Sequence, residues 1–170
     1  MSTHIQSQYF TQALSSLLDE AFEHVHGYFL DKGTAMFETL STVSAQEASI
    51  PVGGRCATLA AQVKHVAFYL DVLERAVRTG VYASVDWDEI WRTTQAVDQA
   101  GWETIKRGLR ESYERVKALI HDTADWPSER EVGSAIAMIA HTAYHLGEIR
   151  QALCTLKSSN PRKIKQDNGG

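Results

Sequence analysis

The sequence predicts an all-α protein built as a four-helix bundle, and three observations carry this prediction. Apolar residues recur every three or four positions over four long segments, which is the spacing of one buried helix face. Alternating strand patterns are rare, and the 170-residue chain holds only three prolines. Four helices with one apolar face each can cover those faces against one another, and a bundle is the arrangement that does so.

The first long helix is expected over residues 4–30, with an apolar stripe that runs from Phe10 to Phe29. Two histidines, His24 and His26, lie near its end. On a helix, residues two positions apart point about 200° from each other. These two rings are therefore expected to lie in solvent or to cap the helix, and not to share a metal ion.

The second long helix is expected over residues 58–79. Thr58 is a favourable N-cap and Gly80 a favourable stop signal. His65 lies between two apolar arcs of this helix, which places it inside the protein. The preceding connector, residues 31–56, is expected to contain short helical pieces, one of them opened by a capping box at Ser44.

The third and fourth long helices are expected over residues 96–123 and 128–157. A short helical turn is expected before the third helix, capped by Asp86. The fourth helix opens with a capping box formed by Ser128 and Glu131. Because the turn between these two helices is short, we expect them to be antiparallel neighbours.

The length suits one domain, which we expect to span residues 1–157, followed by a flexible polar tail over residues 158–170. The net charge of −4 is spread over the chain, so no basic face for nucleic acid is evident. No apolar run is long enough to span a membrane, and the first residues lack the pattern of a signal peptide. A cytoplasmic location is therefore expected.

Three histidines are candidates for a metal site. His141 and His145 are four residues apart, so they lie about 40° apart at one border of the apolar stripe of the fourth helix. His65 on the second helix can complete a three-imidazole site, which leaves positions open on the ion for water or substrate. The alternative is that all three are core-edge histidines bonded to backbone or hydroxyl groups. Spacing alone leaves both interpretations open, because the chain holds seven histidines.

Two segments resemble a known family. QVKHVAFYL, which contains His65, and IAHTAYHLGEIRQAL, which contains His141 and His145, are similar to the two histidine motifs of the DinB/YfiT-like superfamily of metalloenzymes. The resemblance extends over residues 5–157. It implies a four-helix bundle of up-down-down-up topology, usually a homodimer. It also implies a divalent metal ion (nickel, zinc or manganese) held by His65, His141 and His145.

The chain departs from the family pattern at Glu148, where the family usually has glutamine. Glu148 can orient a metal ligand or act as a base, and the alternative is a salt bridge to a basic neighbour. Tyr69 lies one turn after His65 and can donate a hydrogen bond to a bound anion. Its alternative role is to pack its ring with the hydroxyl at the rim.

Two classes of function follow, together with a third that has no metal. The first is a metal-dependent enzyme, either a hydrolase or an S-transferase or isomerase that uses a low-molecular-weight thiol. The resemblance implies both chemistries, and these residues do not separate them. The second is a non-catalytic, stress-related dimer that binds a metal or a small molecule. The third is an interaction module without a metal ion.

Overall fold

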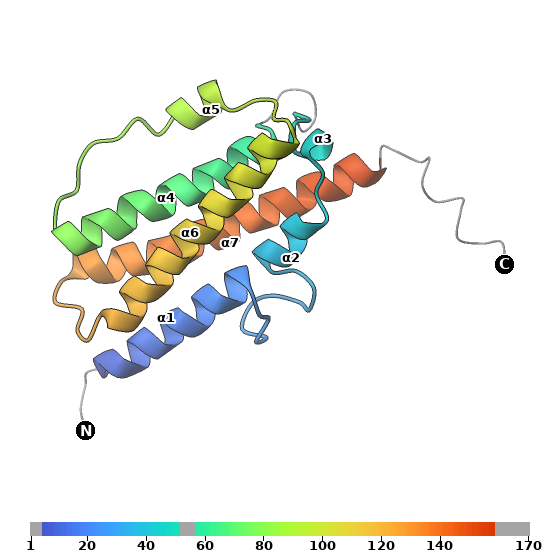
Figure 1. Ribbon diagram of the computed structural model, residues 1–170. Coiled ribbons are helices and arrows are strands. Elements are labelled where there is room, and N and C mark those ends of the chain that lie inside the picture. Colours follow the sequence, from blue (N-terminus) through green and yellow to red (C-terminus); the bar gives the residue numbers. More distant parts are fainter. Residues whose placement is uncertain (1–4, 52–56, 159–170) are drawn as a thin grey trace.

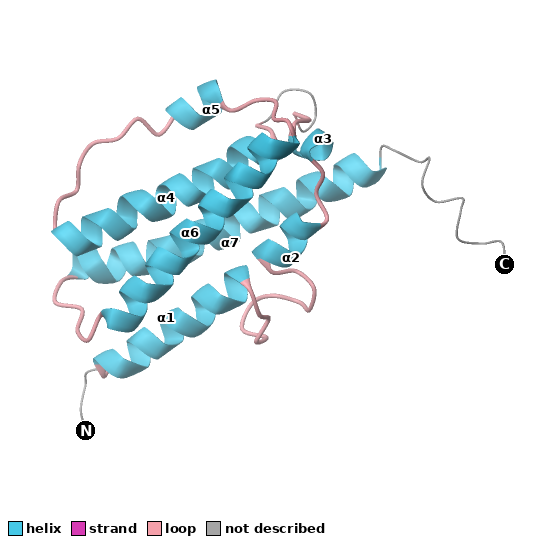
Figure 2. Ribbon diagram, in the orientation of Figure 1, coloured by secondary structure: helices cyan, strands magenta, loops and turns pink. Residues whose placement is uncertain are grey.

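The computed structural model describes residues 5–51 and 57–158, which form helices joined by loops (Figures 1 and 2). No strand is present in these ranges, so the prediction of an all-α protein is confirmed. Within them the chain forms seven helices: α1 (Ser7–Phe22), α2 (Met36–Ser41), α3 (Ala45–Ala48), α4 (Leu59–Thr79), α5 (Glu89–Thr93), α6 (Gln99–Asp122) and α7 (Glu129–Ser158).

Helices α4 and α7 begin where their caps predict. The Thr58 hydroxyl accepts a hydrogen bond from the Ala61 N–H at 3.2 Å, and Gly80 ends α4 with a left-handed φ of 69°. The Ser128 hydroxyl accepts from the Glu131 N–H at 3.2 Å, which forms one half of the predicted capping box. Each cap satisfies a backbone group that a free helix end would leave without a partner.

Helix α6 begins at Gln99, three residues later than predicted. Asp98 is its N-cap, and its carboxylate accepts from the Gly101 N–H at 2.7 Å. The residue before it, Val97, is held outside the helix by Ser49. The Val97 N–H donates to the Ser49 hydroxyl at 2.9 Å, and that hydroxyl donates to the Val97 carbonyl at 3.1 Å. This contact between distant segments overrides the local helical pattern.

Helix α1 ends at Phe22, so the prediction of a helix up to residue 30 is wrong. The carboxylate of Glu20 is buried and accepts hydrogen bonds from four backbone N–H groups that follow the helix. These donors belong to His26, Tyr28, Phe29 and Leu30, at 2.7–3.1 Å. They are therefore not available to continue the helical ladder. Phe29, predicted to face inward, is 41% exposed.

The four long helices enclose one apolar core. Helix α4 packs on α6 and α7, and α1 packs on the same two helices. The predicted pairing of α6 with α7 is therefore not a main contact within the described residues. Tyr113 of α6 instead packs on Phe22 of α1, with ring centroids 4.8 Å apart. Among the long helices, α6 therefore packs mainly on α4 and α1.

The connection from α4 to α6 carries α5 along the outer side of α4 (Figure 1). The predicted short helix is present, but its N-cap is Asp88 and not Asp86. Asp86 instead pairs with Arg92 at 2.5 Å and accepts from the Asp88 N–H at 3.0 Å. These bonds link both ends of the short helix.

The last described helix ends close to where the sequence predicts. Helix α7 extends to Ser158, and the rest of the predicted tail, residues 159–170, lies outside the described residues. Among the described helices, none combines the length and the apolar character that crossing a membrane requires.

The Glu20 carboxylate gives a testable prediction for stability. Burial alone would raise the pKa of Glu20, but the four backbone hydrogen bonds outweigh it and lower the pKa to about 2, from an ordinary 4.5. Its contribution to stability is therefore full above about pH 4.5 and is lost as the pH falls towards 2. We expect Glu20→Gln to lower the free energy of unfolding at pH 7 by about 1–3 kcal/mol, measured by urea titration.

A matched control is Glu111→Gln, because Glu111 is exposed and its ion pair with Arg107 is 4.0 Å long. We expect Glu111→Gln to change the free energy of unfolding by no more than about 0.5 kcal/mol. Equal effects of the two substitutions would contradict the role given to Glu20. So would a wild-type free energy of unfolding that does not fall between pH 4.5 and pH 2.

Candidate metal centre

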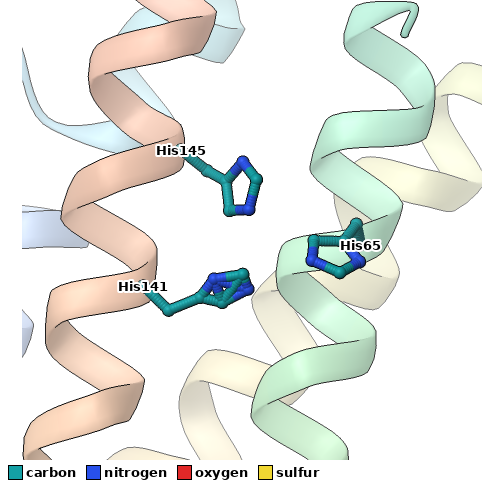
Figure 3. A group of neighbouring side chains, drawn as sticks. All are labelled: His65, His141 and His145. Carbon is teal, nitrogen blue, oxygen red and sulfur yellow. The ribbon is translucent and has the colours of Figure 1, made fainter. Parts of the chain in front are cut away.

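Three histidines from two helices converge in the interior (Figure 3). His141 and His145 lie one turn apart on α7, as predicted, and His65 reaches towards them from α4. His65 and His145 are buried, with 8% and 6% of their surface exposed, and His141 is half-buried. The packing of α4 on α7 is what brings His65 to the other two rings.

The rings are close enough to hold one ion. Their centroids are 4.9 Å apart for His65 and His141, 5.0 Å for His65 and His145, and 4.4 Å for His141 and His145. One nitrogen of each ring lies within 4.8 Å of the others. A tetrahedral ion with bonds of about 2.1 Å needs donors about 3.4 Å apart. Binding of one ion therefore requires these nitrogens to lie somewhat closer together than the 4.8 Å limit.

The three imidazoles are suited to a cation because burial lowers their pKa values and so keeps them neutral. Burial lowers the pKa of His65 to about 4, helped by the neighbouring His145. Burial also lowers the pKa of His141 to about 4, with His145 and His65 adding to the effect. Burial lowers the pKa of His145 as well, and Glu148 opposes this shift. At neutral pH each ring therefore offers a lone pair.

Buried nitrogens without partners support the same interpretation. Within the described residues, His65 Nδ1 and His141 Nε2 are buried and have no hydrogen-bond partner. Buried polar groups in native proteins are nearly always paired, so two such atoms in one cluster need an explanation. These atoms have no backbone or hydroxyl partner, so the alternative of histidines bonded to such groups is not supported.

Glu148 is the carboxylate beside this cluster. Its Oε2 atom lies 2.8 Å from His145 Nδ1, and this contact raises the pKa of His145 against the effect of burial. Tyr144 is its second neighbour, and the hydrogen bond to Glu148 raises the pKa of that phenol. The side chain of Glu148 is 38% exposed, so it connects the buried histidines with solvent.

Tyr69 and two residues that the sequence analysis did not identify lie against the histidines. The Tyr69 ring centroid is 3.6 Å from that of His141, at an interplanar angle of 76°. Trp91 of α5 stacks on His65 at 4.5 Å, and Tyr144 of α7 contacts His145 at 5.0 Å. The helical period of α4 and α7 gave no signal for Trp91, because it comes from the connection between α4 and α6.

The histidines after α1 form a separate, exposed group. Because α1 ends early, His24 and His26 both contact Asp19, with Nδ1–Oδ2 and Nε2–Oδ2 distances of 3.3 Å and 2.7 Å. Both side chains are exposed, so the expectation that they lie in solvent is confirmed, but they converge on Asp19 instead of pointing apart. Asp19, Glu23 and His24 also lie close enough to hold an ion. Glu23, however, already pairs with Arg110 at 2.7 Å.

Comparison of the chain with protein-family models, with curated proteins and with solved structures finds no match.

The geometry predicts which histidines control metal content. We expect the protein to take up one divalent ion per chain, and His141→Ala or His65→Ala to abolish that uptake while helicity stays nearly unchanged. The loss of affinity should exceed the roughly 10- to 100-fold that removal of an outer-shell partner costs. Elemental analysis of untagged protein and calorimetric titration with Zn²⁺, Ni²⁺ and Mn²⁺ measure this, and circular dichroism checks the fold.

Two histidine variants serve as controls. His121 is 86% exposed and lies beside Asp122, so His121→Ala should keep the full metal content. His24→Ala tests the exposed group after α1 and should also keep it. Full metal content in His141→Ala would refute the assignment of the three histidines as ligands. Loss of metal in His24→Ala would indicate that the ion binds at the exposed group after α1 instead.

Proposed function

We propose that this protein is a divalent-metal-dependent enzyme of the DinB/YfiT-like superfamily that acts on a small molecule. The observation that carries the proposal is the convergence of His65, His141 and His145, one nitrogen of each ring lying within 4.8 Å of the others. Three neutral ligands leave the full charge on a bound ion and keep positions open for substrate. The mutual packing of the four long helices supports a four-helix bundle, and the family resemblance adds its up-down-down-up order and a homodimer.

Two chemistries fit this site. A bound nickel, zinc or manganese ion can activate a low-molecular-weight thiol for transfer or isomerisation, or activate water for hydrolysis. Both reactions need a nucleophile to lose a proton near the ion. We propose that Glu148 accepts this proton, because its partly exposed carboxylate lies beside His145. The same contact lets Glu148 orient His145 for metal binding.

Tyr69 is proposed to bind the substrate. Burial raises the pKa of its phenol, so the hydroxyl stays protonated at neutral pH. A protonated hydroxyl donates a hydrogen bond and so can stabilise negative charge that develops on a substrate oxygen. The ring contact with His141 holds Tyr69 next to the proposed ion.

The second candidate is a binding protein that holds a metal or a small molecule without turnover. The contacts of Glu148 favour it, because both His145 and Tyr144 already engage this carboxylate. If the Glu148 carboxylate only orients His145, it does not need to act as a general base. In that case the protein binds the ion but has no general base beside it.

Activity assays separate the candidates. Metal-loaded protein is incubated with bacillithiol, mycothiol or glutathione together with an electrophile, and loss of free thiol is followed. Ester and amide substrates test hydrolysis in parallel. Turnover that chelation abolishes and the added metal restores supports the enzyme. Stoichiometric metal without turnover on any of these substrates supports the binding protein.

The role of Glu148 gives the next prediction. We expect Glu148→Gln to keep the bound metal and to lower kcat by about 10²- to 10⁴-fold, the range that general acid–base catalysis supplies. The exposed Glu129 on the same helix provides the control, and Glu129→Gln should leave kcat unchanged. Metal content is measured beside kcat. Unchanged turnover in Glu148→Gln returns this residue to an orienting role.

A further inference from the structure

Five aromatic side chains lie around the three histidines, each in contact with a histidine or with another of the five. This aromatic surface consists of Phe68, Tyr69, Trp87, Trp91 and Tyr144. Trp87 contacts Phe68 at 5.7 Å and Tyr69 at 5.5 Å, measured between ring centroids. The surface comes from three parts of the chain, namely α4, the connection that carries α5, and α7.

Each histidine is in contact with a different member of this surface. Trp91 stacks on His65, Tyr69 packs edge-on against His141, and Tyr144 packs against His145. Trp91 also lies 6.4 Å from His145, so it spans two of the three rings. The aromatic surface therefore begins at the proposed metal ligands.

Packing of the core does not account for these five rings. None of them belongs to the apolar core or to the half-buried apolar residues that pack against it, whereas Trp102 and Trp126 do. Trp87 remains 38% exposed and Tyr144 63% exposed. Large aromatic side chains that are partly exposed and contiguous mark binding sites more often than solitary exposed ones do. The surface therefore reaches from the histidines to solvent.

We propose that the aromatic surface binds a flat, uncharged aromatic group of the substrate while a neighbouring atom of the same molecule binds the metal ion. This inference rests on the proposed function, because it requires an ion with an open position. Ring stacking and apolar contact would favour such a group. The faces of aromatic rings are electron-rich, and Glu148 adds negative charge beside them, so an anionic group is disfavoured.

A small molecule suits this surface better than a second protein does. Stable protein interfaces bury about 1,200–2,000 Å² in total, and five partly buried side chains offer far less. The aromatic surface also touches the proposed metal ligands. A small molecule bound there can therefore contact the ion and the aromatic rings at the same time. A second copy of the chain would use only the rings.

Two hydroxamates test the proposal. Acetohydroxamate and benzohydroxamate chelate a metal ion through the same group, and only the second carries an aromatic ring. Both are titrated calorimetrically into Zn²⁺-loaded protein, and the ratio of the two Kd values is compared between variants. We expect Trp87→Ala to lower the preference for benzohydroxamate by about threefold to tenfold, the range of one aromatic contact. Acetohydroxamate affinity should not change.

The controls use two further variants. Trp87→Phe keeps an aromatic ring and should keep most of the preference. Tyr9 is exposed near the start of α1 and is not part of the aromatic surface, so Tyr9→Ala should have no effect. Trp91→Ala should also lower the preference, and circular dichroism and zinc content establish that this variant is folded and loaded.

The outcomes separate this inference from the function on which it rests. Failure to bind zinc, or to bind acetohydroxamate once zinc is bound, would refute the open metal site and the inference with it. Zinc and acetohydroxamate binding with an unchanged ratio in Trp87→Ala would refute the aromatic site alone. A change in oligomeric state in Trp87→Ala with an unchanged ratio would also overturn it, and would identify the surface as an interface between copies.

Discussion

The packing of α4 against α7 is the constraint on which the candidate site depends. Two of its imidazoles come from neighbouring turns of one helix, so local geometry fixes their relation. The third, His65, joins them only because the apolar faces of the two helices meet. Burial of polar ring nitrogens without partners, such as His65 Nδ1 and His141 Nε2, costs free energy, and the core around them must offset that cost. Such a site is maintained at the expense of stability.

The surroundings of the three rings combine opposing electrostatic effects. Burial lowers the pKa values of His65 and His145 and keeps them uncharged, whereas the negative charge of Glu148 acts in the opposite direction on both. A carboxylate at this place also complements the positive charge of a bound ion. The buried surroundings thus keep the imidazole lone pairs free for a metal ion, and the negative charge of Glu148 at the edge of the site favours a cation.

Much of the fold could be predicted from sequence wherever the signals were local. The bounds of α4 and α7 follow from an apolar period with caps at known distances, Thr58, Gly80 and Ser128. The end of α1 was missed because Glu20 binds the backbone of residues 26–30, a contact that periodicity does not encode. The histidine pair on α7 was visible from its spacing, and the inward position of His65 followed from the two apolar arcs beside it, although spacing alone left a core histidine equally open. Trp91 gave no signal, since only the folded connection brings it to the site.

The stacking of Trp91 on His65 has an optical consequence. An indole 4.5 Å from a ligand ring is within range of electron or energy exchange with a coordinated ion that has a partly filled d shell. Trp102 and Trp126 are part of the core packing and supply a steadier background of emission. If nickel bound to the three histidines, the fluorescence of Trp91 should therefore decrease, whereas zinc, which has a filled d shell, should change it much less. Trp91 would then report which cation is bound.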